Sequence, residues 1–324
     1  MDKYVISSSP HIQSRQHIIT IMRDVIIALL FPLIAGIWYY GLRALVITVI
    51  STLSAVSFEC IWNWINKKPD TIGDLSACVT GMLIALVLPV TVPLWIPIVG
   101  ALFAIVVAKQ LFGGLGNNFI NPALAARGFL MASWPLLLTT FSEPKTALPL
   151  ISSTIPADAI SSATPLALAK TGGAFPGLFD LFTGNVAGCI GEASVIAILL
   201  GAIYLVIRKV IHPGGPIIYI LTCGFFACMF GYNSHFDTPF LQQICSGGLM
   251  FGAFFMFTDY VTTPSTRLGT VISAFICGFV TALIRMKGGY PEGVTYAILL
   301  VNVITPLLDK YIIPGKYGRK EAGK

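Results

Sequence analysis

A short polar stretch near the middle of the sequence holds the side chains best suited to chemistry. Asp158 opens this stretch, Ser161 and Ser162 follow, and Thr164 closes it immediately before Pro165. Hydroxyl and carboxylate oxygens can accept hydrogen bonds from the first free amides of a helix. Residue types alone therefore predict a polar loop that leads into a short helix, with Thr164 as a turn residue or as the N-cap.

Two charged residues fall inside otherwise apolar segments. Arg127 lies one to two turns into an apolar segment, and Glu59 lies about two turns before Lys67. A charge within a membrane is costly and marks a functional site by default. A long side chain near a helix end can also reach the interface or find a partner there. Both interpretations stay open for Arg127, and the structural one is favoured for Glu59.

Other signs of catalytic or metal chemistry are missing from the sequence. It contains no H-E-x-x-H motif, no phosphate-binding glycine loop and few acidic residues, which argues against hydrolytic chemistry. The seven cysteines include no C-x-x-C pair, and the four histidines are scattered. We therefore expect no catalytic residue, metal cluster or haem, and we interpret the cysteines as small buried apolar side chains.

The composition shows which solvent surrounds most of the chain. Of the 324 residues, 56% are apolar and only 10% are charged, whereas soluble domains carry roughly 25% charged residues. Lipid accounts for this difference, so we predict an all-α polytopic membrane protein. The polar start of the chain does not resemble a cleaved signal peptide. The net charge of +6 then reports orientation rather than binding to nucleic acid.

Apolar segments long enough to span a bilayer predict about ten transmembrane helices. Fourteen Lys and Arg residues fall on the side of the N-terminus and five on the other side. The excess of positive charge places both termini in the cytoplasm and the polar segment 143–186 outside. The predicted spans lie near 18–41, 44–65, 76–91, 93–112, 121–142, 187–208, 214–232, 239–258, 268–286 and 292–313.

The spans also suggest a weak internal repeat. A Gly-Gly turn precedes the fifth span at 113–114 and the tenth span at 288–289. Five spans per half would give the halves opposite topology, an arrangement that places ligand sites at the repeat interface. Independent glycine-rich turns explain the pattern equally well. We expect two membrane halves, 1–142 and 187–324, joined by the extracytoplasmic segment 143–186.

The stretch D-x-x-S-S-A-T at 158–164 resembles the flavin-transfer signature of one family of membrane proteins. That family includes the D subunit of the Rnf complex and the B subunit of the sodium-pumping NADH:quinone oxidoreductase. The likeness runs nearly end to end, and the lack of a long N-terminal extension favours the Rnf member. Ala159 departs from the glycine often found there. Four further stretches resemble the family: YVISSSPHIQS (4–14), AKQLFGGLGNNFINPALAARG (108–128), GAFFMFTDYVTTPSTRLG (252–269) and GGYPEGVTYAILLVNVITPLLD (288–309).

The resemblance implies a covalent flavin. It implies that FMN is esterified through its phosphate to the hydroxyl of Thr164, which a separate Mg-dependent transferase attaches from FAD. Asp158 and Ser161 match the motif positions expected to matter for recognition by that transferase. The family also implies a second flavin, thought to be riboflavin, bound without a covalent link. Arg127 and the glycine-rich turn before the fifth span are our candidates for holding it.

The resemblance further implies a bacterial inner-membrane complex that couples electron transfer between ferredoxin and NAD to Na⁺ or H⁺ movement. The chain would be one non-catalytic component among the other Rnf subunits and membrane lipid, with a fold related to urea-channel-like permeases. A covalent tether would keep the flavin at a high effective concentration outside the cytoplasm. Two other hypotheses stay open: a solute permease or channel without redox activity, and a purely structural anchor.

Overall fold

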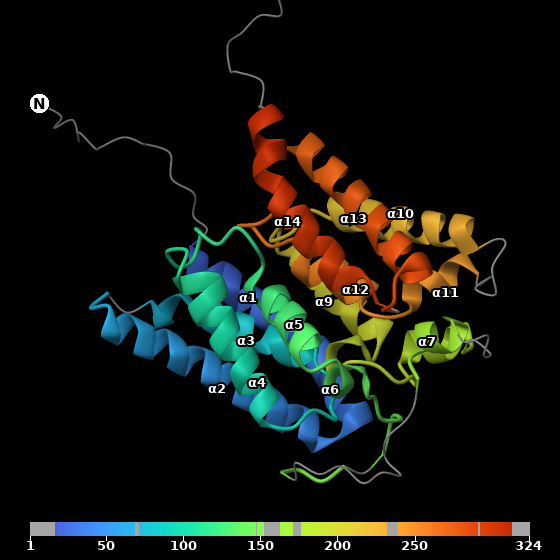
Figure 1. Ribbon diagram of the computed structural model, residues 1–324, viewed down its shortest axis with the longest axis horizontal. Helices are drawn as coiled ribbons and strands as arrows, with labels where there is room; N and C mark the ends of the chain where they lie inside the picture. The colour runs from blue at the N-terminus through green and yellow to red at the C-terminus, as the bar shows by residue number, and fades with distance from the viewer. Residues whose placement is uncertain are drawn as a thin grey trace, which may run out of the picture.

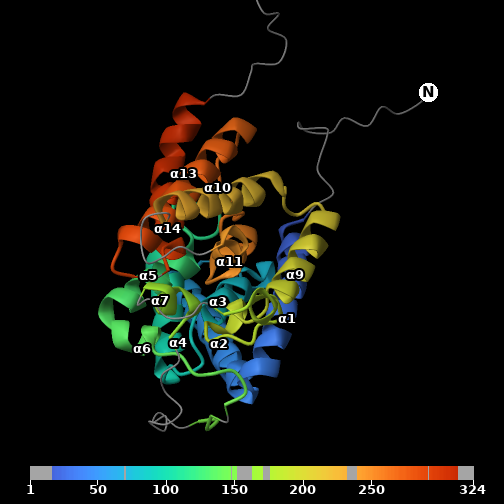
Figure 2. The ribbon, with the colours of Figure 1, turned by 90° about the vertical axis from the view of Figure 1, so that its right-hand side faces the viewer.

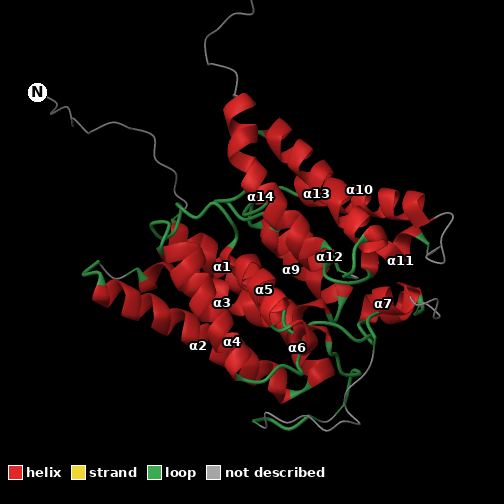
Figure 3. Ribbon diagram, in the orientation of Figure 1, coloured by secondary structure: helices red, strands yellow, loops and turns green. Residues whose placement is uncertain are grey.

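The computed structural model describes residues 17–68, 71–146, 148–151, 163–170, 176–231, 239–290 and 292–312. Within these ranges every regular element is helical and no β-strand occurs (Figure 3). Long apolar helices pack side by side around a large core of buried Leu, Ile, Val, Ala and Phe side chains. This confirms the prediction of an all-α polytopic membrane protein.

The first part of the chain forms one bundle, drawn in blue to green in Figure 1. Helix α1 packs against α2 and α3, and α2 packs against α3 and α4. The elements are α1 (Ile18–Tyr40), α2 (Leu42–Ile65), η1 (Ile72–Asp74), α3 (Ser76–Leu86), α4 (Trp95–Leu102), the π-helical segment η2 (Phe103–Gln110), α5 (Pro122–Ser133) and α6 (Pro135–Thr139).

The later elements form the yellow-green to red part of Figure 1. Helix α10 packs along α13, and α9 packs against α1 of the first bundle (Figure 2). The elements are α7 (Pro165–Lys170), α8 (Leu178–Thr183), η4 (Ile190–Glu192), α9 (Val195–Ile207), α10 (Gly214–Gly231), α11 (Phe240–Cys245), α12 (Leu249–Phe251), the π-helical segment η5 (Gly252–Met256), α13 (Arg267–Lys287) and α14 (Val294–Tyr311).

Five of the predicted spans are single continuous helices. These are the spans predicted near 18–41, 44–65, 214–232, 268–286 and 292–313, which correspond to α1, α2, α10, α13 and α14. Each of these helices is long and apolar enough to cross a membrane. The 23 residues of α1 extend about 35 Å at 1.5 Å per residue, which matches a hydrocarbon core of about 30 Å.

The other five predicted spans contain shorter or interrupted helices. The segment 76–91 is helical only as far as Leu86, 93–112 consists of α4 followed by η2, and 187–208 starts with η4 before α9. The segment 121–142 is divided between α5 and α6, and 239–258 between α11, α12 and η5. Non-helical backbone at membrane depth is tolerated where protein, not lipid, surrounds it. The predicted inverted relation between the two halves stays a prediction.

Two buried arginines satisfy backbone carbonyls where helices are interrupted. Arg43 donates from Nε to the carbonyl of Val90 (2.9 Å) and from a terminal nitrogen to that of Val92 (3.1 Å). Arg285 donates to the carbonyls of Gln243 (2.8 Å) and Ser246 (3.0 Å). Unpaired carbonyls in a lipid-like interior each cost several kcal/mol (~2–7). These arginines, which were among the five basic residues expected outside, therefore stabilise the breaks in the helices.

Glycines allow the closest helix contacts. A Cβ atom on Gly278 of α13 would lie 2.7 Å from the carbonyl oxygen of Tyr219 in α10. A Cβ atom on Gly201 of α9 would lie 2.6 Å from the carbonyl oxygen of Ala28 in α1. Small residues at helix contacts are the usual means of close packing in membranes, where no hydrophobic force draws helices together.

Candidate functional site

Thr164 caps the short helix α7. Its hydroxyl oxygen accepts a hydrogen bond from the amide of Ala167 (3.3 Å), and its carbonyl accepts one from Leu168 (2.9 Å). The side chain is buried, with 3% exposure. Of the two roles that residue type predicts for Thr164, turn residue or N-cap, the structure shows the N-cap. Asp158 and Ser161 lie outside the described residues, so their expected roles stay predictions.

A cavity of about 290 Å³ lies beside Thr164. The two neighbours of Thr164 in the chain, Ala163 and Pro165, both line it, whereas Thr164 itself does not. The lining mixes carboxylate and amide groups with apolar side chains, which is typical of a site for a ligand with polar and aromatic parts. The other lining residues are Glu143, Pro144, Leu168, Pro176, Asp180, Asn185, Val186 and Ala187.

Helix α7 is fastened to the segment that precedes α14. The amine of Lys170 donates to the carbonyls of Gly288 (2.6 Å) and Tyr290 (3.1 Å), and partial burial lowers the pKa of this amine. Leu166 and Ala169 pack against Met286 near the end of α13. The 18 residues of α14 then extend about 27 Å to its far end. Helix α7 therefore lies at the opposite end of α14 from Tyr311.

Arg127 belongs to a buried cluster of charged side chains. One terminal nitrogen of its guanidinium lies 2.8 Å from a carboxylate oxygen of Glu292, and the other lies 3.4 Å from one of Glu192. The nitrogen that bonds to Glu292 also donates to the sulfur of Cys189, at 3.6 Å. Three elements supply this cluster: Arg127 comes from α5, Glu192 from η4 and Glu292 from the loop before α14.

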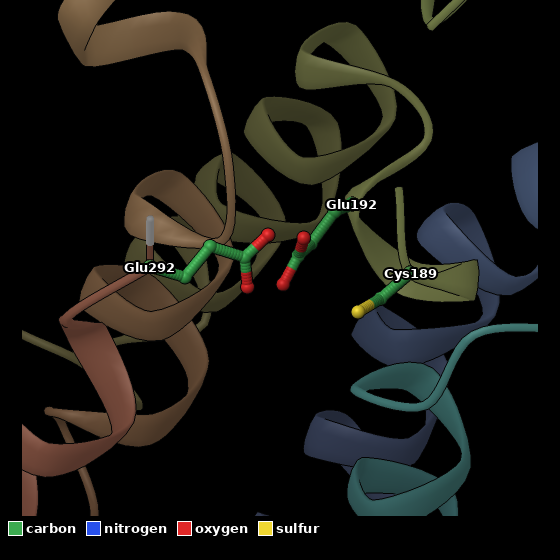
Figure 4. A group of neighbouring side chains, drawn as sticks. All are labelled: Cys189, Glu192 and Glu292. Atoms are coloured by element: carbon green, nitrogen blue, oxygen red, sulfur yellow. The ribbon is translucent and has the colours of Figure 1, made fainter. Parts of the chain in front are cut away.

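The acidic half of this cluster also meets a geometric criterion for holding a cation. One carboxylate oxygen of Glu192, one of Glu292 and the sulfur of Cys189 all lie within 4.8 Å of one another. Figure 4 shows the two carboxylates facing each other, with Cys189 on the far side of Glu192. Glu192 and Glu292 did not enter our predicted site. In the sequence, each of them is an acidic residue beside a glycine near the start of a predicted span.

Glu59 belongs to a separate network in which every charge has a partner. The amine of Lys109 lies 2.9 Å from both carboxylate oxygens of Glu59 and 2.6 Å from the hydroxyl of Ser76. Gln110 and Thr71 donate to the same carboxylate at 3.0 and 2.7 Å. Buried charges are stable when they are paired and fully hydrogen-bonded. This agrees with the structural interpretation of Glu59.

A second cavity lies next to the glycine-rich turn that precedes α5. Asn118 and Asn121 from that turn line it, as does Asp259, which lies 3.5 Å from the amide nitrogen of the Asn121 side chain. Apolar side chains from α1, α3 and η5, including Val25, Leu83, Phe254 and Phe255, form its walls. Arg127 does not line this cavity. The structure therefore does not bring together the two candidates for the second flavin.

The fold and these interior groups define a multi-pass helical membrane protein with paired charges and polar cavities inside its bundle. The chain belongs to the NQR2, RnfD, RnfE family, whose family model matches residues 5–318. A relative from Acetobacterium woodii, the D subunit of a Na⁺-translocating ferredoxin:NAD⁺ oxidoreductase complex, is 46% identical over 98% of this chain and 97% of its own.

Two further relatives bear names of the same kind. The D subunit of the proton-translocating ferredoxin:NAD⁺ oxidoreductase complex of Clostridium ljungdahlii is 39% identical over 98% of this chain and 97% of its own. The D subunit of an ion-translocating oxidoreductase complex from Mannheimia succiniciproducens is 35% identical over 99% of both chains. The similarity to these relatives thus extends along nearly the whole chain.

Proposed function

We propose that this chain is the D subunit of a bacterial Rnf-type complex that couples electron transfer between ferredoxin and NAD to Na⁺ or H⁺ translocation. The near-complete alignment with relatives that carry this name supports the proposal. The same names favour a redox subunit over a solute permease or a structural anchor. Its partners are the other Rnf subunits and membrane lipid.

We also propose that FMN is attached through its phosphate to Thr164. The position of Thr164 in the structure supports this attachment. The hydroxyl stands at the start of α7, between two residues that line a cavity of about 290 Å³. Mixed polar and apolar walls suit a flavin, which has an aromatic ring and a polar edge. When attached, the flavin supplies electron transfer, including one-electron steps.

The chain itself positions the attachment point. Lys170 fastens α7 to the carbonyls before α14, and Leu166 fixes the face of α7 that packs on α13. Because the hydroxyl of Thr164 is buried in the cap of α7, we expect attachment to take place before α7 docks. Recognition by the transferase then falls to Asp158 and Ser161.

The placement of α7 supports the predicted orientation. Helix α7 lies about 27 Å along α14 from Tyr311, a distance close to the hydrocarbon thickness of about 30 Å. The far end of α1 meets the same polar region, since the hydroxyl of Tyr40 donates to the carbonyl of Val186. With both termini in the cytoplasm, the FMN on Thr164 lies on the outer side.

For the second flavin, the cavity beside the glycine-rich turn suits an isoalloxazine edge better than Arg127 does. Asn118, Asn121 and Asp259 offer amide and carboxylate groups between apolar walls, whereas the guanidinium of Arg127 is taken by two carboxylates. The cavity measures about 90 Å³, below the roughly 300–1,000 Å³ of typical ligand pockets. Its side chains must therefore move apart to hold a flavin ring.

The test is covalent flavin fluorescence after denaturing electrophoresis. Protein produced in a host that contains the flavin transferase should fluoresce as the wild type and lose the signal in Thr164→Val. Thr183→Val is the matched control, because the hydroxyl of Thr183 bonds to carbonyls within its own helix α8, and this variant should keep full fluorescence. A fluorescent Thr164→Val protein, or a dark wild type, would overturn the assignment.

A further inference from the structure

The buried cluster around Arg127 carries one more negative charge than positive. Two carboxylates, Glu192 and Glu292, share the single guanidinium, and the three side chains are 3%, 12% and 7% exposed. An uncompensated charge in a low-dielectric interior costs far more than one in water. These three residues by themselves therefore call for one additional positive charge nearby.

The two carboxylates also present oxygens without a protein partner. Oε2 of Glu192 and Oε1 of Glu292 are buried and make no hydrogen bond within the described part of the chain. Each carboxylate uses its other oxygen to hold Arg127. Buried oxygens of this kind normally have a partner. Both remaining oxygens belong to the face-to-face carboxylates of Figure 4.

Other titratable groups around the cluster do not bond to the two free oxygens. The hydroxyl of Tyr40 is held by the carbonyl of Val186 and the amide of Gly188. Arg285 brings a positive charge close to Glu292, because a Cβ atom on Gly247 would lie 3.6 Å from its Nη2 and 3.7 Å from Cγ of Glu292. Its guanidinium, however, donates to the carbonyls of Gln243 and Ser246. Within the described part of the chain, no neighbour therefore bonds to Oε2 of Glu192 or Oε1 of Glu292.

We propose that Glu192 and Glu292 together bind one monovalent cation, Na⁺ or H⁺. A single positive charge balances the two carboxylates and Arg127, and the buried guanidinium of Arg285 nearby disfavours a divalent ion. One oxygen from each carboxylate and the sulfur of Cys189 lie within 4.8 Å of one another, close enough for one ion to contact them together. A role of this site in ion translocation rests on the proposed function, but binding to the chain does not.

Two adjacent glycines connect this cation site to the helix of Thr164. A Cβ atom on Gly247 would lie 2.9 Å from Leu166 of α7, and one on Gly248 would lie 2.3 Å from Oε1 of Glu192. The Gly247–Gly248 turn therefore has α7 on one side and a cation ligand on the other. Leu166 lies two residues after Thr164, the proposed flavin attachment point. A shift of α7 would therefore displace the Gly247–Gly248 turn and, with it, the carboxylate of Glu192.

The test is equilibrium binding of radioactive sodium to the purified full-length chain in lipid nanodiscs. The wild type should bind one Na⁺ per chain in a saturable manner, and choline should not compete. Glu192→Gln and Glu292→Gln should each lose this binding, because either change removes one negative charge and one carboxylate ligand. Asp309→Asn removes the same charge from a carboxylate that bonds to Ser265, far along α14 from the cluster, and should bind Na⁺ as the wild type does.

A proton at the site would give a different result in a second measurement. The wild type would then bind no Na⁺, and its infrared spectrum would show a buried protonated carboxyl band that disappears in Glu292→Gln but persists in Asp309→Asn. Absence of both signals, or Na⁺ binding that survives in both glutamine variants, would overturn the proposal. Flavin on Thr164 is measured separately on the same protein, so failure of this site and failure of the proposed function remain distinguishable.

Discussion

Replacing Arg127 with glutamine should destabilise the protein strongly. The guanidinium is 7% exposed and lies 2.8 Å from Glu292 and 3.4 Å from Glu192. Its removal leaves two buried carboxylates facing each other without their shared cation. Breaking a buried ion pair in this way costs about 3–5 kcal/mol, which is roughly a 10²- to 10⁴-fold shift in the folding equilibrium.

Arg208 offers a matched control with the same chemistry in a different environment. It pairs with Asp24 at 3.0 Å, and its side chain is 46% exposed, whereas that of Asp24 is 5% exposed. Water can reach the guanidinium, so the ion pair contributes less than a fully buried one, and Asp24 keeps the hydrogen bond from the hydroxyl of Tyr204 at 3.2 Å. We therefore expect Arg208→Gln to cost clearly less stability than Arg127→Gln.

The assay is unfolding in mixed micelles with increasing denaturing detergent, followed by circular dichroism. Arg127→Gln should unfold at a clearly lower detergent fraction than Arg208→Gln. Adding Glu292→Gln to Arg127→Gln should recover part of the loss, because it removes one of the two unpaired charges. Equal midpoints for the two arginine variants would refute the reasoning that burial makes the Arg127 cluster energetically decisive.

Two further predictions concern stability. Lys109→Met leaves the buried carboxylate of Glu59 without its cation, so it should cost about 3–5 kcal/mol in the same unfolding assay, and adding Glu59→Gln should recover most of that loss. Gly184→Ala forces a side chain onto backbone with φ +103° and places Cβ 1.7 Å from the carbonyl oxygen of Ala193; strain of this kind costs about 1–3 kcal/mol before the clash is added. Gly184→Ala should thus yield little monodisperse protein by size-exclusion chromatography, whereas Gly289→Ala, with nothing within 4 Å, should behave as the wild type. Full stability of Lys109→Met, or a normal yield of Gly184→Ala, would contradict these two arguments.

The long spans were predictable because lipid imposes one simple rule on them. The predicted ends of the spans 18–41 and 268–286 differ by at most one residue from those of α1 and α13. A continuous apolar run of this length has few alternatives to a membrane helix. Thr164 was predictable as an N-cap for a similar reason, since capping depends on local residue type.

The interrupted spans were not predictable from apolar content. The segment 239–258 is apolar enough for one helix, yet Gly247 adopts φ +64° and divides it. Arg285, about forty residues away in the sequence, donates to carbonyls at this break. Local hydropathy holds no information about such a distant donor, so the break becomes visible only in the folded chain.

The buried cluster was invisible for the same reason. Arg127 meets Glu192, 65 residues later, and Glu292, 165 residues later. The sequence marked Arg127 as a charge inside a span but offered no partner for it. Cys189 is the small buried side chain that its residue type suggested, since it packs with Phe141 and Ala187, but its contact with the guanidinium of Arg127 at 3.6 Å was equally invisible in the sequence.

The most direct test of the account is peptide mass spectrometry of the protein purified from its native host. The account predicts that the peptide containing Thr164 carries the added mass of an esterified FMN, and that fragmentation assigns the addition to Thr164. Recovery of that peptide only in its unmodified form, from a host with an active flavin transferase, would contradict the central claim.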